Sequence, residues 1–183
     1  MKKYLLIFAY YFSFSCSAQK PVDKNLLDLY LKTLPSCLHK PFPAFSYQTV
    51  KNKNICTHDL LGKITLIDFW FEACPPCVAQ IEGLKKVYEM FQGNKDFQFV
   101  SFTWDTKNTA IQNAIKHALH YDIISINEQE CSRLNCSQGF PVIMIVDKTG
   151  EIIFFKAGSS LNEQVSTQYA MDSICPVIDR YLK

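Results

Sequence analysis

The chain has 183 residues, of which 48% are hydrophobic and 20% charged, values that fit one soluble globular domain and exclude a disordered chain, a coiled coil or a repeat array. The formal net charge is +2, and two of the lysines lie in a leading segment that we expect to be removed. The remaining 17 basic (19 − 2) and 17 acidic side chains balance, so no basic surface indicates nucleic-acid binding.

The leading segment has the pattern of a signal peptide. Two lysines precede an apolar run at residues 4–14, and small residues follow up to Ala18. The run is shorter than the roughly 20 residues that a membrane-spanning helix needs. We therefore expect residues 1–18 to direct export to the periplasm, with cleavage after Ala18. A lipid anchor at Cys16 is the alternative, although no Leu stands three residues before that cysteine.

A helix and a connector, residues 19–43, are expected to precede the main domain, residues 44–183. Apolar side chains recur at helical spacing within residues 25–34, and Pro35 ends that helix. Further prolines mark the connector.

The main domain is predicted to open with a β-hairpin. Residues 44–50 and 54–57 have the composition of short strands, and the polar sequence Lys51-Asn52-Lys53 forms the turn between them.

Two strand–helix pairs follow the hairpin. Residues 64–71 form an almost continuous apolar run, typical of a strand buried on both faces. Residues 75–91 are predicted to be a helix, since proline suits the first helical position and Gly93 lies just beyond the end. A strand at residues 97–104 and an amphipathic helix at residues 109–120 complete this part.

The last third is predicted to contain a hairpin and a closing helix. Its expected elements are a short helix or turn at residues 128–136, strands at 142–146 and 151–156 around a turn at 147–150, and a helix at 161–181 interrupted at Pro176. The order βαβα and then ββα predicts an α/β domain with a mixed central sheet flanked by helices.

The clearest chemical signal is the sequence Cys74-Pro75-Pro76-Cys77 between a buried strand and a helix. This position places Cys74 at the helix N-terminus, where unpaired N–H groups and the helix dipole favour a thiolate. Cys77 lies one turn inside the helix, close enough to form an intramolecular disulfide. We predict Cys74 as the attacking sulfur and Cys77 as the resolving one.

Asp68 is unusual because a carboxylate within a buried apolar strand is unfavourable unless it is hydrogen-bonded or used in the chemistry. One hypothesis is that burial raises its pKa and that it exchanges a proton with Cys77. The alternative is a structural aspartate bonded to nearby backbone or water.

The other cysteines of the exported chain permit structural disulfides or simple burial: Cys37, Cys56, Cys131, Cys136 and Cys175. Cys131 and Cys136 are near enough in sequence to form a disulfide that closes a small loop, if the distance between their Cα atoms allows it.

A zinc site would need four ligands, and only one C-x-x-C is present, even though His117 and His120 have helical spacing. We expect no metal and no cofactor beyond the redox-active disulfide of Cys74 and Cys77.

The segment from residue 63 to 77 resembles the thioredoxin superfamily, and specifically its exported TlpA-like and ResA-like oxidoreductases. The similarity covers roughly residues 44–182 and includes Gly139-Phe140-Pro141 before a strand. It implies a thioredoxin-like fold, a cis Pro141 that faces the C-x-x-C, and pairing of the Phe140 backbone with a disulfide substrate.

We assign Trp70, Pro75 and Pro76 to the same substrate-binding surface as Phe140. Two positions depart from relatives: Ala73 replaces a common Trp, and Gln80 stands where many cytochrome-maturation relatives have Glu. Asp68 matches the buried acid of thioredoxin.

The expected function is thiol-disulfide exchange on protein substrates outside the cytoplasm, as a monomeric reductase. The family implies a membrane thiol-electron carrier as the source of electrons. A disulfide-forming oxidase is the first alternative, and a copper or haem delivery module that uses the same cysteines is the second. A thiol peroxidase is disfavoured because Cys74 is part of a C-x-x-C.

Overall fold

The computed structural model of the protein describes residues 36–183. The predicted signal peptide, the lipid site at Cys16 and the helix at residues 25–34 lie outside the described residues. Within the described range, the helices are too short or too polar to cross a bilayer.

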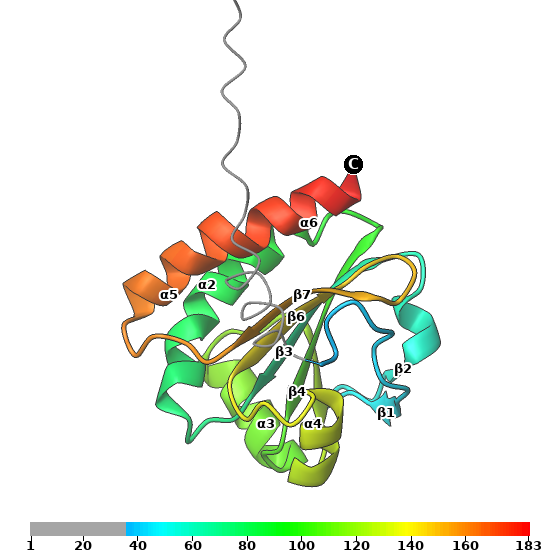
Figure 1. Cartoon of the computed structure of the whole chain (residues 1–183). Coiled ribbons are helices and arrows are strands. Elements are labelled where there is room, and N and C mark those ends of the chain that lie inside the picture. The colour runs from blue at the N-terminus through cyan, green and yellow to red at the C-terminus, as the bar shows by residue number, and fades with distance from the viewer. Residues whose placement is uncertain (1–35) are drawn as a thin grey trace, which may run out of the picture. The chain divides into compact units, whose positions relative to one another are not determined.

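A five-stranded mixed sheet forms the centre of the domain (Figure 1). Its strand order is β5-β4-β3-β6-β7. Strands β3, β4 and β5 run parallel, while β6 and β7 run antiparallel to their neighbours. The bounds are β3 Ile64–Trp70, β4 Phe97–Thr103, β5 Asp122–Ser125, β6 Val142–Val146 and β7 Ile152–Ala157. The predicted mixed sheet with flanking helices is confirmed.

Strand β5 is absent from the sequence prediction, which left residues 121–127 without an element. It has four residues and pairs in parallel with β4. A run this short carries little periodicity, and its strand character comes from pairing at the sheet edge.

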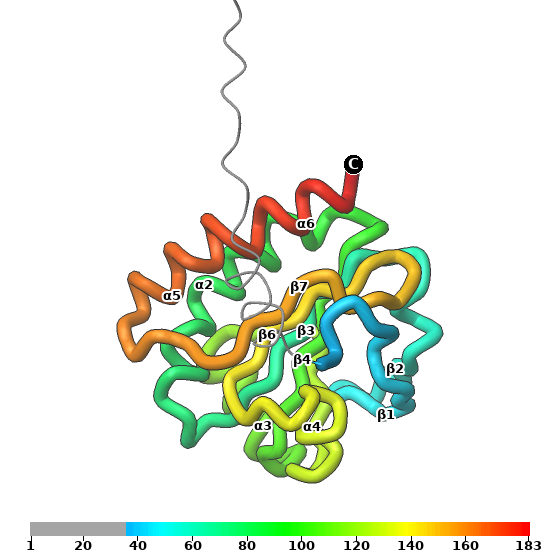
Figure 2. The backbone as a smooth tube through the Cα atoms, in the orientation of Figure 1, coloured from blue at the N-terminus to red at the C-terminus, as the bar shows by residue number. Residues whose placement is uncertain are grey.

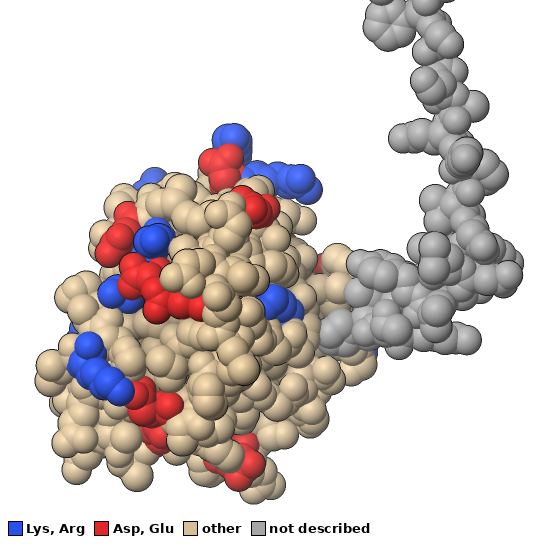
Figure 3. Space-filling model, turned by 90° about the vertical axis from the view of Figure 1, so that its left-hand side faces the viewer, with Lys and Arg blue, Asp and Glu red and all other residues tan. Residues whose placement is uncertain are grey.

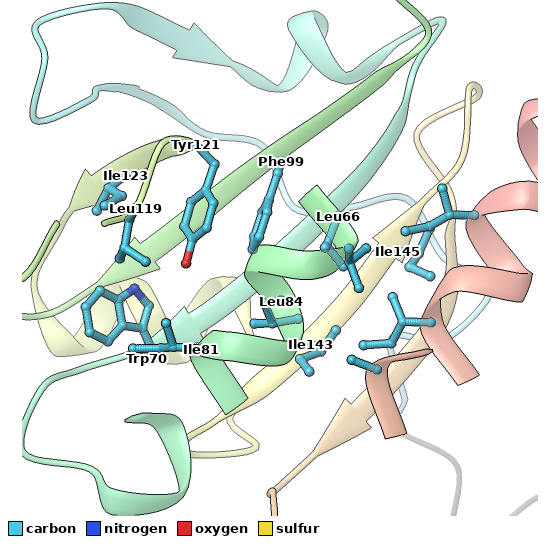
Figure 4. Close-up of a cluster of buried hydrophobic side chains, with 14 of the residues drawn as sticks. Leu66, Trp70, Ile81, Leu84, Phe99, Leu119, Tyr121, Ile123, Ile143 and Ile145 are labelled. Atoms are coloured by element: carbon cyan, nitrogen blue, oxygen red, sulfur yellow. The ribbon is translucent and has the colours of Figure 1, made fainter. Parts of the chain in front are cut away.

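Two hydrophobic clusters cover the two faces of the sheet. Successive side chains of a strand point to opposite faces. Leu66 and Trp70 of β3 therefore join the cluster beneath helix α2 (Pro75–Phe91), and Ile67 and Phe69 join the other. Figure 4 shows the first cluster around α2, with Tyr121 directing its hydroxyl into it.

Helix α2 (Pro75–Phe91) and the C-terminal helical segment lie side by side over the first face (Figures 1 and 2). A Cβ atom at Gly83 would approach the Thr167 Cα to 2.9 Å, so the close packing of α2 on α5 requires glycine there. The C-terminal segment consists of α5 (Glu163–Tyr169), a π-helical turn (Ala170–Ile174) and α6 (Cys175–Leu182). The predicted interruption at Pro176 is thus a π-helical turn just before the proline.

The second face is covered by shorter elements. The N-terminal hairpin pairs β1 (Ser46–Gln48) with β2 (Asn54–Cys56), as predicted, and a 3₁₀ turn follows at Thr57–Leu60. Helix α4 (Glu128–Leu134) packs there through Cys131 and Leu134.

Helix α3 (Lys107–Lys116) is shorter at its C-terminal end than the predicted 109–120. Ala118 adopts a left-handed conformation with φ 52°, which ends the helix before Tyr121 and β5.

Candidate active site at the Cys74–Cys77 disulfide

Cys74 and Cys77 form a disulfide at the junction of β3 and α2, with Cα atoms 5.2 Å apart. Cys74 is the N-cap of α2, and Pro75 and Pro76 occupy its first positions. The Cys77 N–H donates to the Cys74 Sγ at 3.3 Å. An N–H group that points at this sulfur also stabilises a thiolate there once the bond is reduced.

The two sulfurs differ in access. Cys74 is 6% exposed and Cys77 is fully buried, while Pro75 beside them is exposed. Attack by an external thiol or disulfide is therefore favoured at the Cys74 side of the bond. This asymmetry fits the predicted roles of an attacking Cys74 and a resolving Cys77.

Asp68 lies in the middle of β3 on the face covered by α2, and it is 1% exposed. Its Oδ1 accepts a hydrogen bond of 2.8 Å from the Gln80 Nε2. Burial raises the pKa of Asp68 to about 8, although the bond from Gln80 opposes the shift. Gln80 stands one turn beyond Cys77 on α2, so the helix that carries Cys77 also holds the buried acid.

We expect Asp68→Asn to remove a pH dependence of stability. With the pKa at about 8 in the folded protein and 3.8 ordinarily, only the folded state keeps its proton between these values. The free energy of unfolding should then fall with rising pH by up to about 1.4 kcal/mol per unit from about pH 4 to 8. An asparagine keeps the hydrogen bond from Gln80 without titrating. Urea unfolding of both proteins at pH 5 and pH 8 checks this, and parallel pH profiles would contradict it.

The Phe140–Pro141 peptide bond is cis, as predicted, and Pro141 is buried at the start of β6. The Pro141 carbonyl accepts a hydrogen bond of 2.8 Å from the Gly158 N–H, which ties the end of β7 to this turn. Because β6 runs antiparallel to β3, the first residues of β6 lie at the same end of the sheet as the last residues of β3.

Three partly exposed aromatic side chains meet at this end of the sheet, and we call Phe71, Trp104 and Phe140 the aromatic cluster. Ring centroids lie 4.5 Å apart for Phe71 and Trp104, and 5.3 Å for Phe140 with each of the other two. The Phe71 carbonyl accepts the Cys74 N–H at 3.2 Å, so the cluster adjoins the reactive disulfide.

Sequence reasoning identified Phe140 but missed Phe71 and Trp104, which follow β3 and β4. Neighbouring parallel strands end on the same side of the sheet, so the residues that directly follow β3 and β4 could have been expected to lie together. The assignment of Trp70 to the substrate-binding surface needs correction. Trp70 is 1% exposed, and its Nε1 donates to the Ser101 Oγ at 2.7 Å inside the first cluster.

Charged side chains near the site are paired with one another. The Glu72 carboxylate contacts His117 at 2.9 Å and also Lys116, and the Glu72 N–H donates to Asp105. Partial burial raises the pKa of Glu72, but the bonds from Lys116 and His117 outweigh it and leave the pKa below its ordinary value. Figure 3, seen from the side where α2 and α5 begin, shows a largely uncharged surface with small groups of charges.

A second disulfide joins Cys37 and Cys136, with Cα atoms 6.3 Å apart. The Cys131–Cys136 loop considered from sequence is therefore not formed. Within residues 36–183, Cys56, Cys131 and Cys175 are free thiols.

Burial raises the pKa of the Cys131 thiol to about 12, which makes this cysteine a poor nucleophile. The described residues 36–183 contain no group of three or more His, Cys, Asp or Glu arranged around a metal position.

Comparisons with known proteins agree with this geometry. A family model described as thioredoxin-like matches residues 62–152. The chain is 26% identical over 160 residues to a thiol:disulfide interchange protein DsbE of Allochromatium vinosum, covering 85% of this chain and 83% of the relative. It is 25% identical over 130 residues to the thiol-disulfide oxidoreductase ResA of Bacillus cereus, covering 69% and 73%. A crystal structure of a thioredoxin family protein from Chlorobium tepidum superimposes with a TM-score of 0.62 at 19% identity, covering 78% of this chain and 96% of the other.

Proposed function

The chain belongs to the thioredoxin superfamily and is a thiol-disulfide oxidoreductase, and from that premise we propose that it reduces protein disulfides outside the cytoplasm through Cys74 and Cys77. The observation that carries the proposal is the disulfide at the start of α2, in which Cys74 is slightly exposed and Cys77 is fully buried. Reduction of insulin disulfides by the reduced protein tests it.

The reaction begins with the Cys74 thiolate, which attacks one sulfur of a substrate disulfide and releases the other as a thiolate. Cys77 then loses its proton and attacks the Cys74 sulfur of the mixed disulfide. The substrate leaves as a dithiol and the protein keeps the Cys74–Cys77 disulfide, so two electrons pass to the substrate. Asp68 accepts the Cys77 proton in this proposal, since its pKa of about 8 suits proton exchange with a thiol. An Asp68→Asn variant with an unchanged rate and pH profile would contradict that role.

The direction of exchange depends on the reduction potential of the Cys74–Cys77 pair. A reductase needs a potential near that of thioredoxin, about −270 mV, whereas an oxidase lies nearer −120 mV. Equilibration with glutathione buffers, followed by thiol mapping with mass spectrometry, measures this potential.

The alternative function, delivery of copper or haem through the same two cysteines, is tested in parallel by titrating the reduced protein with Cu(I).

Export is supported by two features of the chain. The first is the signal-like segment at residues 1–18, and the second is the Cys37–Cys136 disulfide, because structural disulfides persist in oxidising compartments. A membrane thiol carrier then supplies electrons, and the mature protein starts at Gln19 or carries lipid at Cys16. Cell fractionation and mass spectrometry of the mature N-terminus separate these two forms.

In this proposal the aromatic cluster binds the substrate residues that neighbour the substrate cysteine. We expect Trp104→Ala to raise KM for a protein disulfide by about tenfold and to change kcat little, because the ring contacts substrate and not the sulfurs. Steady-state kinetics with insulin and with 2-hydroxyethyl disulfide checks this. Tyr181→Ala, which removes an exposed aromatic ring on α6, is the matched control. Equal losses for both substrates would argue against the contact.

A further inference from the structure

We infer that the Cys37–Cys136 disulfide is a positioning clamp, which holds the loop at residues 135–140 so that Phe140 stays packed against Phe71 in the aromatic cluster and protein substrates bind. This inference rests on the proposed function, since it concerns recognition of protein partners by the same site. Cys37 and Cys136 act through Phe140 and are positioning residues.

The backbone of the loop at residues 135–140 adopts conformations that are unfavourable for residues with a Cβ atom. Cys136 and Ser137 adopt left-handed conformations with φ 61° and 58°, which residues with a Cβ rarely occupy, and Gly139 follows with φ 73°. Inside the loop, the Asn135 Nδ2 donates to the Gly139 carbonyl at 2.7 Å, and Asn135 is fully buried. The Ser137 N–H donates to the Ser132 carbonyl at 2.8 Å, and the Gln138 N–H donates to the Asn135 carbonyl at 3.4 Å. These bonds tie the turn to the end of α4, and the disulfide at Cys136 ties it covalently to the segment around Cys37.

The other end of the clamp is fixed to the sheet. Cys37 is 9% exposed, and the segment after it runs along the start of β7 (Figure 2). The His39 N–H donates to the Ile152 carbonyl, and the Ile152 N–H donates to the Lys40 carbonyl, each at 2.9 Å. The Phe42 N–H donates to the Gly150 carbonyl at 2.9 Å. The disulfide thus joins the loop to a point that is itself anchored.

A single residue, Phe71, connects the loop to the reactive disulfide. Phe140 places its ring at 90° to that of Phe71, and the Phe71 carbonyl holds the Cys74 N–H. A loop that moves would shift one wall of the substrate surface while the Cys74–Cys77 pair and α2 stay in place. The affinity for a peptide should therefore change, and the reactivity toward a small thiol should not.

The test uses the oxidised protein, so that the clamp stays intact in the wild type. Its Cys74–Cys77 disulfide takes two electrons from the reduced A chain of insulin, and a disulfide forms in that chain. Alkylation and mass spectrometry follow the reduction of Cys74–Cys77 and verify the Cys37–Cys136 bond. We expect Cys37→Ala combined with Cys136→Ala to raise the half-saturating peptide concentration by about fivefold or more, with the maximal rate changed less than about twofold. The rate with dithiothreitol should stay at the wild-type value.

Two controls separate positioning from general destabilisation. Cys56→Ala removes a cysteine in the hairpin region, and Ile178→Ala destabilises α6 in the other hydrophobic cluster. Both should keep the wild-type half-saturating concentration. An unchanged value in the double variant, or the same rise in Ile178→Ala, overturns the inference. A reduced wild-type protein that reduces 2-hydroxyethyl disulfide but not insulin would instead contradict the proposed function.

Discussion

Replacing Cys74 with serine is expected to lower the rate of disulfide exchange by at least about a thousandfold, because it removes the sulfur of the more exposed cysteine of the pair. Insulin reduction and exchange with a small disulfide should fall together, since both need this nucleophile. Serine is close in size to cysteine, so α2 and its N-cap should remain. Circular dichroism and thermal unfolding of the variant check that the fold is kept.

Cys77→Ser should fail differently. The first attack by Cys74 still occurs, but no buried thiol completes the reaction, so a mixed disulfide between Cys74 and the substrate accumulates. Non-reducing electrophoresis and mass spectrometry detect it. Cys56→Ser, which changes a free cysteine in the hairpin region, serves as the control and should trap nothing. Mixed disulfides at Cys77 in the Cys74→Ser variant would reverse the assignment of the two sulfurs.

Removing the Cys37–Cys136 disulfide is expected to reduce the free energy of unfolding by about 4 to 5 kcal/mol, the value for a closed loop of about 100 residues. The two cysteines are 99 residues apart, so the bond limits the unfolded chain strongly. The melting temperature should fall by about 10–20 °C for a domain of this size. Urea unfolding of the Cys37→Ala, Cys136→Ala double variant under non-reducing conditions measures the effect.

The Cys131→Ala variant is a useful control for this loss. Cys131 belongs to the same hydrophobic cluster and is fully buried, but it is a free thiol. Its removal should cost about 1 to 2 kcal/mol through the lost packing of one buried sulfur. A double variant as stable as Cys131→Ala would show that the disulfide adds little beyond the packing of its side chains.

The local parts of the site could be predicted because neighbouring residues determine them. Spacing of three residues and prolines at the helix start were enough to predict the Cys74–Cys77 bond at the start of α2. The apolar run around Asp68 was enough to predict its burial. The family resemblance, and not the spacing, led to the cis bond before Pro141.

Other features depend on segments that are distant in sequence. Gln80 meets Asp68 because α2 folds back over β3, and Trp104 meets Phe140 because β3 lies between β4 and β6 in the sheet. The short β5 strand is formed by pairing with β4, and the Val50 N–H also donates to its Ile123 carbonyl. No pattern within any one of these segments contains this information.

The sequence alone determined the reactive sulfur pair and the buried acid, since each follows from side-chain period and spacing within one segment. The order of the predicted elements along the chain determined the α/β character of the domain. The tertiary structure decided which cysteine pairs with Cys136, which aromatic rings meet in the aromatic cluster, and that Trp70 lies inside the core. The physical reason is that side chains far apart along the chain come together only through the order and direction of the strands.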